Sequence, residues 1–243
     1  MTRTVEVGSI SEGWLQGTAA VLAARGRHIN HLFIRMRQPL PEVEAIRTAF
    51  DALLVEFDHQ PIDEVRNTIF PVETAEDTDG PAELAADYVE HYDFIKRLGS
   101  EHGTYFGRVV AHPRAGGEAG PQLEHTIEKL ERAKTGKRWK AIYEVNIYSE
   151  EHDRNIKRGF PCMSHLAFQL DGERVDCLAT YRSHDMIKKA YGNYLGLAEL
   201  QRYVADQSGF EPGELSVLAG HAAIEGLNRA QLDELRALIA EHS

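Results

Sequence analysis

The sequence has few cysteines, no long apolar run and a deficit of positive charge, and each shortage excludes a class of protein. Its 243 residues include only two cysteines, which argues against a disulfide scaffold and favours a reducing, cytoplasmic setting. No apolar run of about 18 residues is present, so we expect no transmembrane helix. The first residues also lack the apolar stretch of a secretory signal.

The charge balance argues against two kinds of partner. The chain carries 27 Lys and Arg residues against 38 Asp and Glu residues, a formal net charge of −11. We therefore expect no broad binding to nucleic acid or to acidic membranes, although a small basic pocket for one phosphate remains compatible with this charge. The 12 histidines form no His-x-x-x-His pair or Cys/His cluster, so we expect no metal ion.

The sequence does contain apolar patterns typical of strands and of helices, in an irregular order along the chain. Alternating apolar residues predict strands over residues 29–37, 139–149 and 214–224. Apolar residues spaced three and four apart predict helices from Pro41, from Pro81, over about 122–134, up to Gly209 and after Asn228. These elements do not alternate as βαβ units, and no linker divides them. We therefore expect a single α+β domain over residues 1–243, with a mixed sheet and flanking helices.

A β-hairpin is predicted where two alternating runs flank Asp171-Gly172, a strong turn signal. A hairpin that closes symmetrically about Gly172 and Glu173 places Cys162 opposite Ser183, one residue from Arg182. A thiol beside a guanidinium is a candidate nucleophile, because positive charge favours the thiolate.

Arg182 and Ser183 together also offer the donors that a phosphate requires. The alternative is that Cys162 is a small buried apolar residue, which is the usual state of a cysteine in a strand. We assign Cys177 to the core, because it shares the parity of its apolar neighbours.

Several motifs around this hairpin resemble the thymidylate synthase superfamily. They are Pro161-Cys162, "YRSHD" at 181–185, "GN" at 192–193 and "LQRYVADQSGFEPGEL" at 200–215. The resemblance is specific over 158–220, weaker over 123–146, and only an outline before about residue 80. It implies a thymidylate synthase-like fold, a pyrimidine nucleoside monophosphate as substrate and 5,10-methylenetetrahydrofolate as the one-carbon donor.

The resemblance also implies a covalent mechanism in a homodimer. Cys162 would add to C6 of the pyrimidine, which makes C5 nucleophilic toward the methylene of the folate. Arg182 and Ser183 would bind the phosphate, together with Arg138 of the partner subunit. Asn193 would read the N3/C4 edge of the base, since an amide presents both a donor and an acceptor.

Asp185, in the specific motif at 181–185, would take part in catalysis and face the folate and the pyrimidine. Looser similarities imply further site residues, and by one of them Tyr92 and Asp93 would contact the folate. Glu56 resembles the family's glutamate for proton transfer, although a glutamate on a helix surface fits that position equally well. Tyr105 lies near the family's Tyr-Gly motif, where we expect it to pack.

An arginine near the N-terminus would add to the phosphate site. "ARGRHINH" stands roughly where the family has its phosphate loop, so either Arg25 or Arg27 would replace the loop's arginine. The resemblance leaves open which of the two binds the phosphate.

Two departures from the family predict a different reaction. The synthases' His and Tyr that hold the deoxyribose 3′-hydroxyl are replaced by Ala223 and Glu225, which favours ribose. The sequence also stops after one amphipathic helix, without the tail that closes over the folate, so we expect water to reach the reacting methylene.

We therefore expect a cytoplasmic enzyme that hydroxymethylates CMP at C5, in nucleoside antibiotic biosynthesis. The alternatives are a thymidylate synthase acting on dUMP, a dCMP hydroxymethylase, and a nucleotide-binding protein without activity.

Overall fold

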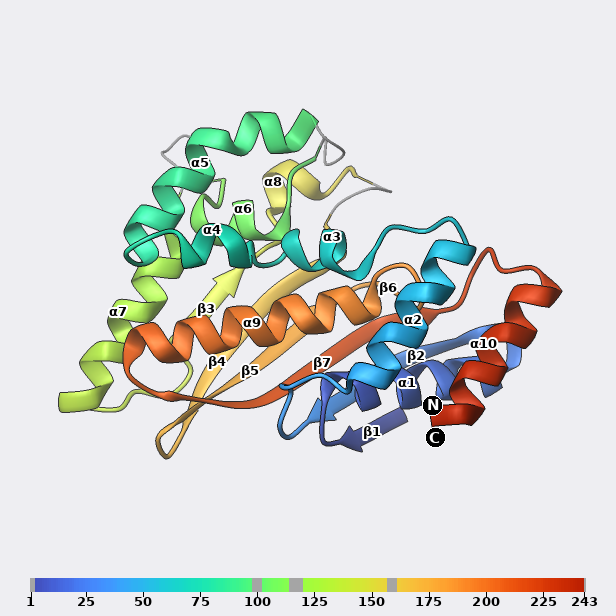
Figure 1. Ribbon diagram of the computed structural model, residues 1–243. Helices are drawn as coiled ribbons and strands as arrows, with labels where there is room; N and C mark the ends of the chain where they lie inside the picture. The colour runs from blue at the N-terminus through green and yellow to red at the C-terminus, as the bar shows by residue number, and fades with distance from the viewer. Residues whose placement is uncertain (1–2, 98–101, 114–119, 157–160, 243) are drawn as a thin grey trace.

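A seven-stranded mixed sheet forms the centre of the computed structural model, which describes residues 3–97, 102–113, 120–156 and 161–242 (Figure 1). The strands are β1 (Arg3–Val7), β2 (His28–Met36), β3 (Tyr143–Asn146), β4 (Met163–Asp171), β5 (Arg174–Tyr181), β6 (His184–Asp185) and β7 (Glu211–Ala223). Their order is β1-β2-β7-β5-β4-β3, with β6 pairing beside β7. β1 is parallel to β2, and β7 is parallel to β5 and β6, whereas the other pairs are antiparallel.

Helices connect the strands and vary widely in length. They are α1 (Ile10–Ala23), the 3-10 turn η1 (Arg25–Arg27), α2 (Glu44–Glu56), α3 (Ile62–Asn67), α4 (Val72–Glu76), α5 (Pro81–Arg97), α6 (Tyr105–Val110), α7 (Gln122–Thr135), α8 (Glu150–Asp153), α9 (Ala190–Ser208) and α10 (Arg229–His242). Each helix within the described ranges is too short or too polar to cross a lipid bilayer.

The two faces of the sheet differ in how well they are covered. Leu32, Ile34 and Val217 are buried on the face packed against α1 and α9 (Figure 1). Residues of the opposite parity are less covered: Leu218 is half-buried, and Leu178 is 38% exposed. The chain by itself therefore leaves one sheet face partly accessible.

Helix α9 crosses the covered face and is the most buried helix of the chain's second half. Gly192 lets α3 approach its first turn closely, because a β-carbon at Gly192 would lie 2.7 Å from the carbonyl oxygen of Ile62. This approach places the N-terminal ends of α3 and α9 side by side, next to β6.

The mixed sheet with its flanking helices confirms the predicted α+β class. The helices predicted from Pro81, up to Gly209 and after Asn228 are α5, α9 and α10, and the strands predicted over 29–37 and 214–224 are β2 and β7. Two differences stand out. The strand predicted over 139–149 is limited to β3, and β1 and α1 occupy an N-terminal segment where the sequence analysis assigned no element.

Candidate active site

The hairpin of β4 and β5 has the predicted register along most of its length. Pairing runs symmetrically from Asp171 opposite Arg174 at the turn to His165 opposite Thr180. Cys177 is 3% exposed on this hairpin, which confirms its assignment to the core. Between His165 and Met163 the register shifts by one residue, as in a β-bulge.

The bulge changes the partner of Cys162. Met163 pairs with Tyr181, and the N–H of Arg182 donates to the carbonyl oxygen of Cys162 at 2.8 Å. Cys162 therefore lies opposite Arg182, and the prediction that it faces Ser183 is wrong by one residue. Arg158, where the specific resemblance over 158–220 begins, lies outside the described residues.

Cys162 is a free, half-buried thiol that lies beside Tyr105 at the start of α6. The N–H of Cys162 donates to the Tyr105 hydroxyl oxygen at 3.3 Å. Burial raises the pKa of Tyr105 above its usual range, and the charge of Cys162 adds to that effect. The phenol is thus neutral at physiological pH and lies next to the proposed nucleophile.

The position of Tyr105 depends on local capping. The Thr104 side chain accepts from the N–H of Gly107 at 3.1 Å, which caps α6, and it shares a 2.7 Å hydrogen bond with the Tyr88 hydroxyl. The sequence analysis expected Tyr105 only to pack. The threonine immediately before it was the signal for a helix that begins there.

The turn after β5 places three predicted site residues together. Arg182 and Ser183 are exposed, and Asp185 is half-buried in β6. One oxygen of Asp185 accepts from the N–H groups of Ile187 at 3.0 Å and Lys188 at 2.9 Å, which shapes the turn into α9. This carboxylate therefore helps to order the backbone at the candidate site.

His184 is a buried site residue that the sequence analysis did not single out. Its Nε2 lies 3.0 Å from the Asn193 amide nitrogen, and its ring stacks on Tyr181 at 4.3 Å. Burial lowers the pKa of His184 to about 3, so the imidazole is neutral at physiological pH. Asn193 is 3% exposed, and this neutral ring orients its amide.

The 3-10 turn η1, directly before β2, lies at the end of the sheet that carries Asp185. His28 and Asp185 both pair with Ala223, on its two sides, so their backbones lie about 10 Å apart. Arg25 in η1 is exposed, whereas Arg27 is half-buried and its Nε is a buried atom without a hydrogen-bond partner among the described residues. Of the two arginines, Arg27 is thus better placed to meet an anion.

Arg138 and Glu56 are not brought to Cys162 within the chain. Arg138 donates to the Gly172 carbonyl oxygen at 2.6 Å and forms an ion pair with Glu173, at the hairpin tip. The nine residues of β4 separate that tip from Cys162 by about 30 Å. Glu56 is exposed in the last turn of α2.

Tyr92 and Asp93 on α5, which are predicted to contact a folate, have partners within the chain. The Tyr92 hydroxyl accepts from the N–H of Thr104 at 3.1 Å, so Tyr92 supports the segment that carries Tyr105. Asp93 is exposed and pairs with Lys96 at 2.6 Å, which lowers the pKa of this carboxyl.

A cleft of about 590 Å³ lies between α3, α4 and α5, next to this site. It is lined by Gln60 and Glu64 on one side, by Tyr88 and His91 on α5, and by Thr104, which precedes Tyr105. None of the predicted site residues lines this cleft, which reaches the candidate site through Thr104 alone, the residue before Tyr105.

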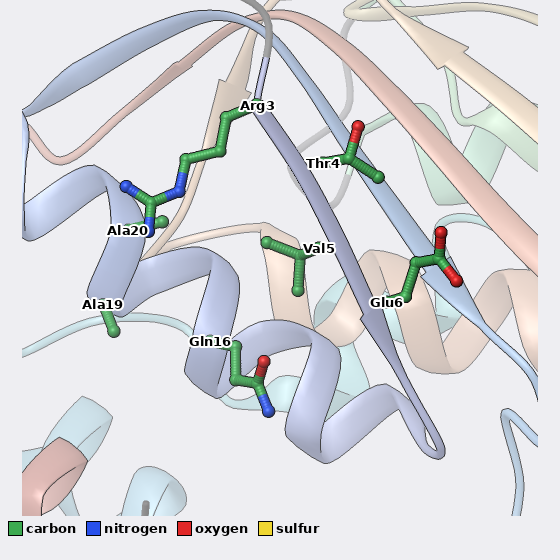
Figure 2. A pocket seen from close by; sticks show the side chains of 7 residues that line it. All are labelled: Arg3, Thr4, Val5, Glu6, Gln16, Ala19 and Ala20. Carbon is green, nitrogen blue, oxygen red and sulfur yellow. The ribbon is translucent and has the colours of Figure 1, made fainter.

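A second groove, of about 380 Å³, lies at the far edge of the sheet between β1 and α1. Figure 2 shows Arg3 extending from β1 toward Ala20, with Gln16 on the adjacent helix face. The groove between β1 and α1 is lined by none of the predicted site residues. No group of three or more His, Cys, Asp or Glu side chains within the described residues is arranged to hold a metal ion.

Comparison with known proteins gives consistent matches. Residues 75–238 match the family model described as thymidylate synthase. A "Putative thymidylate synthase" of Methanothermobacter marburgensis is 26% identical over 237 residues, which cover 97% of this chain and 98% of that protein.

Shorter matches are more similar. Proteins of the same description from Methanococcoides burtonii and Methanosarcina mazei are 33% and 32% identical over 103 and 98 residues. These segments cover 42% and 40% of this chain, and the chain spans 45% and 43% of the length of those two relatives.

Proposed function

The chain belongs to the thymidylate synthase family, and on that premise we propose that it transfers a one-carbon unit from 5,10-methylenetetrahydrofolate to C5 of a pyrimidine nucleoside monophosphate. The specific reaction we propose is 5-hydroxymethylation of CMP by a cytoplasmic enzyme of nucleoside antibiotic biosynthesis. The observation that carries the proposal is the half-buried Cys162 opposite Arg182, with the Tyr105 hydroxyl at its N–H group.

The proposed mechanism begins with addition of the Cys162 thiolate to C6 of the base, which places a nucleophilic electron pair at C5. The folate supplies the methylene unit that C5 takes up. C5 then loses its proton while the bond between the transferred carbon and the folate nitrogen breaks, water adds to the resulting exocyclic methylene, and the bond from C6 to Cys162 breaks. The net change is one hydroxymethyl group for one hydrogen, with tetrahydrofolate as the second product.

The remaining residues have proposed roles that follow from their positions. Arg182 and Ser183, exposed on the turn, bind the phosphate, and Arg27 or Arg25 adds to it from η1. Asn193, oriented by His184, reads the N3/C4 edge of the base. The absence of the His and Tyr sugar clamp at positions 223 and 225 supports ribose.

The folate is proposed to bind in the cleft between α3, α4 and α5. Tyr88 and His91 offer ring surfaces there, while Tyr92 and Asp93 would act from the same helix without lining the cleft. Asp185 is proposed to face both ligands. Glu56 remains our prediction for proton transfer, although Glu64, which lines the cleft, is an alternative on α3.

We propose a homodimer of single-domain chains in which Arg138 of the partner subunit completes the phosphate site. Two observations support it: Arg138 lies at the hairpin tip, about 30 Å from its own Cys162, and one sheet face keeps Leu178 38% exposed. Mixing inactive Cys162→Ser and Arg138→Ala proteins tests this sharing. Activity returns in the mixture if Arg138 acts across the interface, and stays absent if it acts within its own chain.

The test of the reaction is deuterium release from C5 of [5-²H]CMP, [5-²H]dCMP and [5-²H]dUMP with methylenetetrahydrofolate, followed by the mass of the product. Release from CMP with a gain of one hydroxymethyl group supports the proposal. Release from dCMP with the same gain moves the substrate to deoxyribose. Cys162→Ala protein is the control for release without the nucleophile.

The second candidate is a thymidylate synthase that methylates dUMP, which the description of the archaeal relatives favours. It predicts release from dUMP, a methyl product and formation of dihydrofolate, which is detected by its absorbance. A protein that binds nucleotide without catalysis would release no deuterium from any of the three substrates, and Cys162→Ala would leave its nucleotide affinity unchanged.

A further inference from the structure

A cleft of about 310 Å³ lies beside the tip of the hairpin, far from Cys162. Its walls come from the segment after β2, from α9 and from the first residues of β5 and β7, and Arg37, Arg174 and Arg202 line it together. The eight residues of β5 place Arg174 about 25 Å from Arg182, which lies opposite Cys162. The cleft is therefore separate from the candidate active site.

Positive charge gathers in this cleft, against the trend of the chain. Three of its ten lining residues are arginines and one, Glu211, is an acid. In the whole sequence, by contrast, 38 Asp and Glu residues stand against 27 Lys and Arg residues. A local excess of positive charge in an acidic protein attracts anions to that place.

Two of the three guanidinium groups have no carboxylate bound to them. Arg37 forms an ion pair with Glu6 at 3.1 Å. Within the described residues, the side chains of Arg174 and Arg202 form no ion pair or hydrogen bond, and Arg202 has only a longer-range attraction to Glu199. An arginine binds phosphate or carboxylate through parallel N–H groups. Arg174 and Arg202 thus keep these donors for a ligand.

The backbone that carries these arginines is held in place by hydrogen bonds. Gln201 on α9 is fully buried, and its amide nitrogen donates to the carbonyl oxygens of Val175 at 2.7 Å and Glu214 at 3.1 Å. These bonds tie α9 to the first residues of β5 and β7. On the opposite wall, the N–H of Arg37 donates to the last carbonyl oxygen of β1 at 3.1 Å. The walls are therefore formed before binding, which lowers the entropic cost of taking up a ligand.

We infer that this cleft binds a small, multiply charged anion through Arg174 and Arg202, with Arg37 as a weaker third contact. Its volume lies at the lower end of the range of about 300–1,000 Å³ for small-molecule sites, which fits a compact ligand. The chemistry that these side chains recognise is a group of phosphate or carboxylate oxygens. None of the three arginines has a role in the proposed reaction, so the inference does not rest on the proposed function.

The test is isothermal titration calorimetry with inorganic pyrophosphate as the phosphate probe and citrate as the carboxylate probe. We expect Arg174→Gln and Arg202→Gln each to weaken binding at least about tenfold, because each loses a charge-assisted pair of hydrogen bonds. Arg37→Gln should weaken binding only about two- to threefold, since Glu6 already offsets part of that charge. Arg236→Gln removes an exposed arginine on α10, and this matched control should bind like wild type.

Glu211 gives a prediction of the opposite sign. Its carboxylate lines the same cleft and repels an anion there. Glu211→Gln should therefore strengthen binding about two- to threefold, whereas Glu128→Gln, on the distant helix α7, should not change it. Weaker binding in Glu211→Gln would mean that the carboxylate itself contacts the ligand, and it overturns the inference of an anion.

The two probes distinguish the chemical source of the anion. Tighter binding of pyrophosphate assigns the cleft to a phosphate compound, and tighter binding of citrate assigns it to a polycarboxylate. Comparable affinities leave the shared chemistry as the property that is recognised. If neither probe binds at millimolar concentration, the inference is wrong.

The proposed phosphate site at Arg182 requires an arm of its own, because a probe could bind there instead. Arg182→Gln should leave the binding at the cleft intact. Binding that Arg182→Gln abolishes, and that Arg174→Gln and Arg202→Gln leave unchanged, overturns the inference. If a glutamine variant does not fold, lysine at the same position keeps the charge and loses the paired donors. That variant should still weaken binding about threefold, and an unchanged affinity overturns the inference.

Discussion

The two ends of the hairpin formed by β4 and β5 are built in different ways. At the tip, the turn after Asp171 is regular and exposed, and Glu173 pairs with Arg138 and Lys134. At the other end the ladder is bulged, and Tyr105 from α6 lies against Cys162. One end of the hairpin is thus a regular turn with exposed ion pairs, and the other end packs against a residue from a distant segment of the sequence.

This difference has physical consequences. The tip is surrounded by water, where exposed ion pairs contribute little to stability. The thiol end holds buried polar groups, such as His184 and Asn193, whose hydrogen bonds cannot be replaced by water. We therefore expect substitutions at the thiol end to have large effects on chemistry and stability, and substitutions at the tip to have small ones.

The largest effect is expected on turnover, from substituting Cys162, with the buried Cys177 as the comparison. Cys162→Ala should reduce deuterium release at least about a thousandfold, because the covalent step is lost. Cys177→Ala should keep turnover and lower the free energy of unfolding by about 1 kcal/mol through lost packing. Turnover assays and urea unfolding of both variants measure this contrast. Turnover that survives in Cys162→Ala would contradict the assignment of the nucleophile.

The next effect concerns the pH dependence of stability and arises from His184. Its pKa is lowered to about 3, so the unfolded chain takes up a proton near pH 6.5 that the folded chain does not. The stabilisation is complete above pH 6.5 and is lost as the pH falls toward 3, at up to about 1.4 kcal/mol per pH unit. Urea unfolding between pH 4 and pH 8 measures this slope.

Replacing His184 separates its contribution from that of other groups. His184→Gln should flatten the decline below pH 6.5, since glutamine does not titrate. The control is His91→Gln on α5, because His91 is exposed and the Asp87 backbone and carboxylate raise its pKa. An equal flattening in both variants would contradict the assignment of the slope to the buried ring.

Tyr105→Phe should have an intermediate effect. It removes the hydroxyl that accepts from the N–H of Cys162 and leaves the ring that packs edge-on against Tyr181 at 6.3 Å. We expect turnover to fall about tenfold, which corresponds to one lost hydrogen bond at the site, with little change in the free energy of unfolding. Tyr203→Phe on α9 is the control for loss of a tyrosine hydroxyl away from Cys162. Unchanged turnover in Tyr105→Phe would show that this tyrosine serves only packing.

The parts of the fold that the sequence predicted are those determined by local periodicity. Alternation around Asp171-Gly172 determined the register of the hairpin, and helical spacing determined α5 and α10. Helix α1 was not predicted, because its glycines have the appearance of turn residues. Gly17 instead allows close packing on β2, since a β-carbon there would lie 2.6 Å from the Ile34 side chain.

The candidate site was predictable where its residues adjoin a motif, and not where they depend on folding. Arg182, Ser183 and Asp185 follow the hairpin directly and could be named from the sequence. The bulge beside Cys162 was missed, because its mark in the sequence is confined to one residue: the buried Met163 is out of phase with the buried Leu166 and Phe168. Tyr105 and Cys162 are 57 positions apart, so only the packing of α6 against the hairpin brings them together.

The smallest effect is expected at the tip. Side-chain hydrogen bonds from Arg138 and Lys134 lower the pKa of Glu173 to about 2, but the carboxylate is exposed to solvent. Glu173→Gln should therefore change Tm by no more than about 2 °C, as should the control Glu128→Gln, which breaks an exposed pair with Arg132 on α7.

The small decrease in Tm expected for Glu173→Gln should also become smaller at low pH. Because the pKa of Glu173 is lowered, any stabilisation is present above about pH 4.5 and is lost as the pH falls toward 2. Scanning calorimetry at pH 7 and pH 3, at low and high salt, measures the Tm difference between wild type and Glu173→Gln. A decrease in Tm much larger than that of Glu128→Gln would mean that the tip is ordered by this ion pair, and the contrast between the two ends would then fail. A matching small change, with turnover unaltered in the same protein, confines the chemistry to the end that carries Cys162.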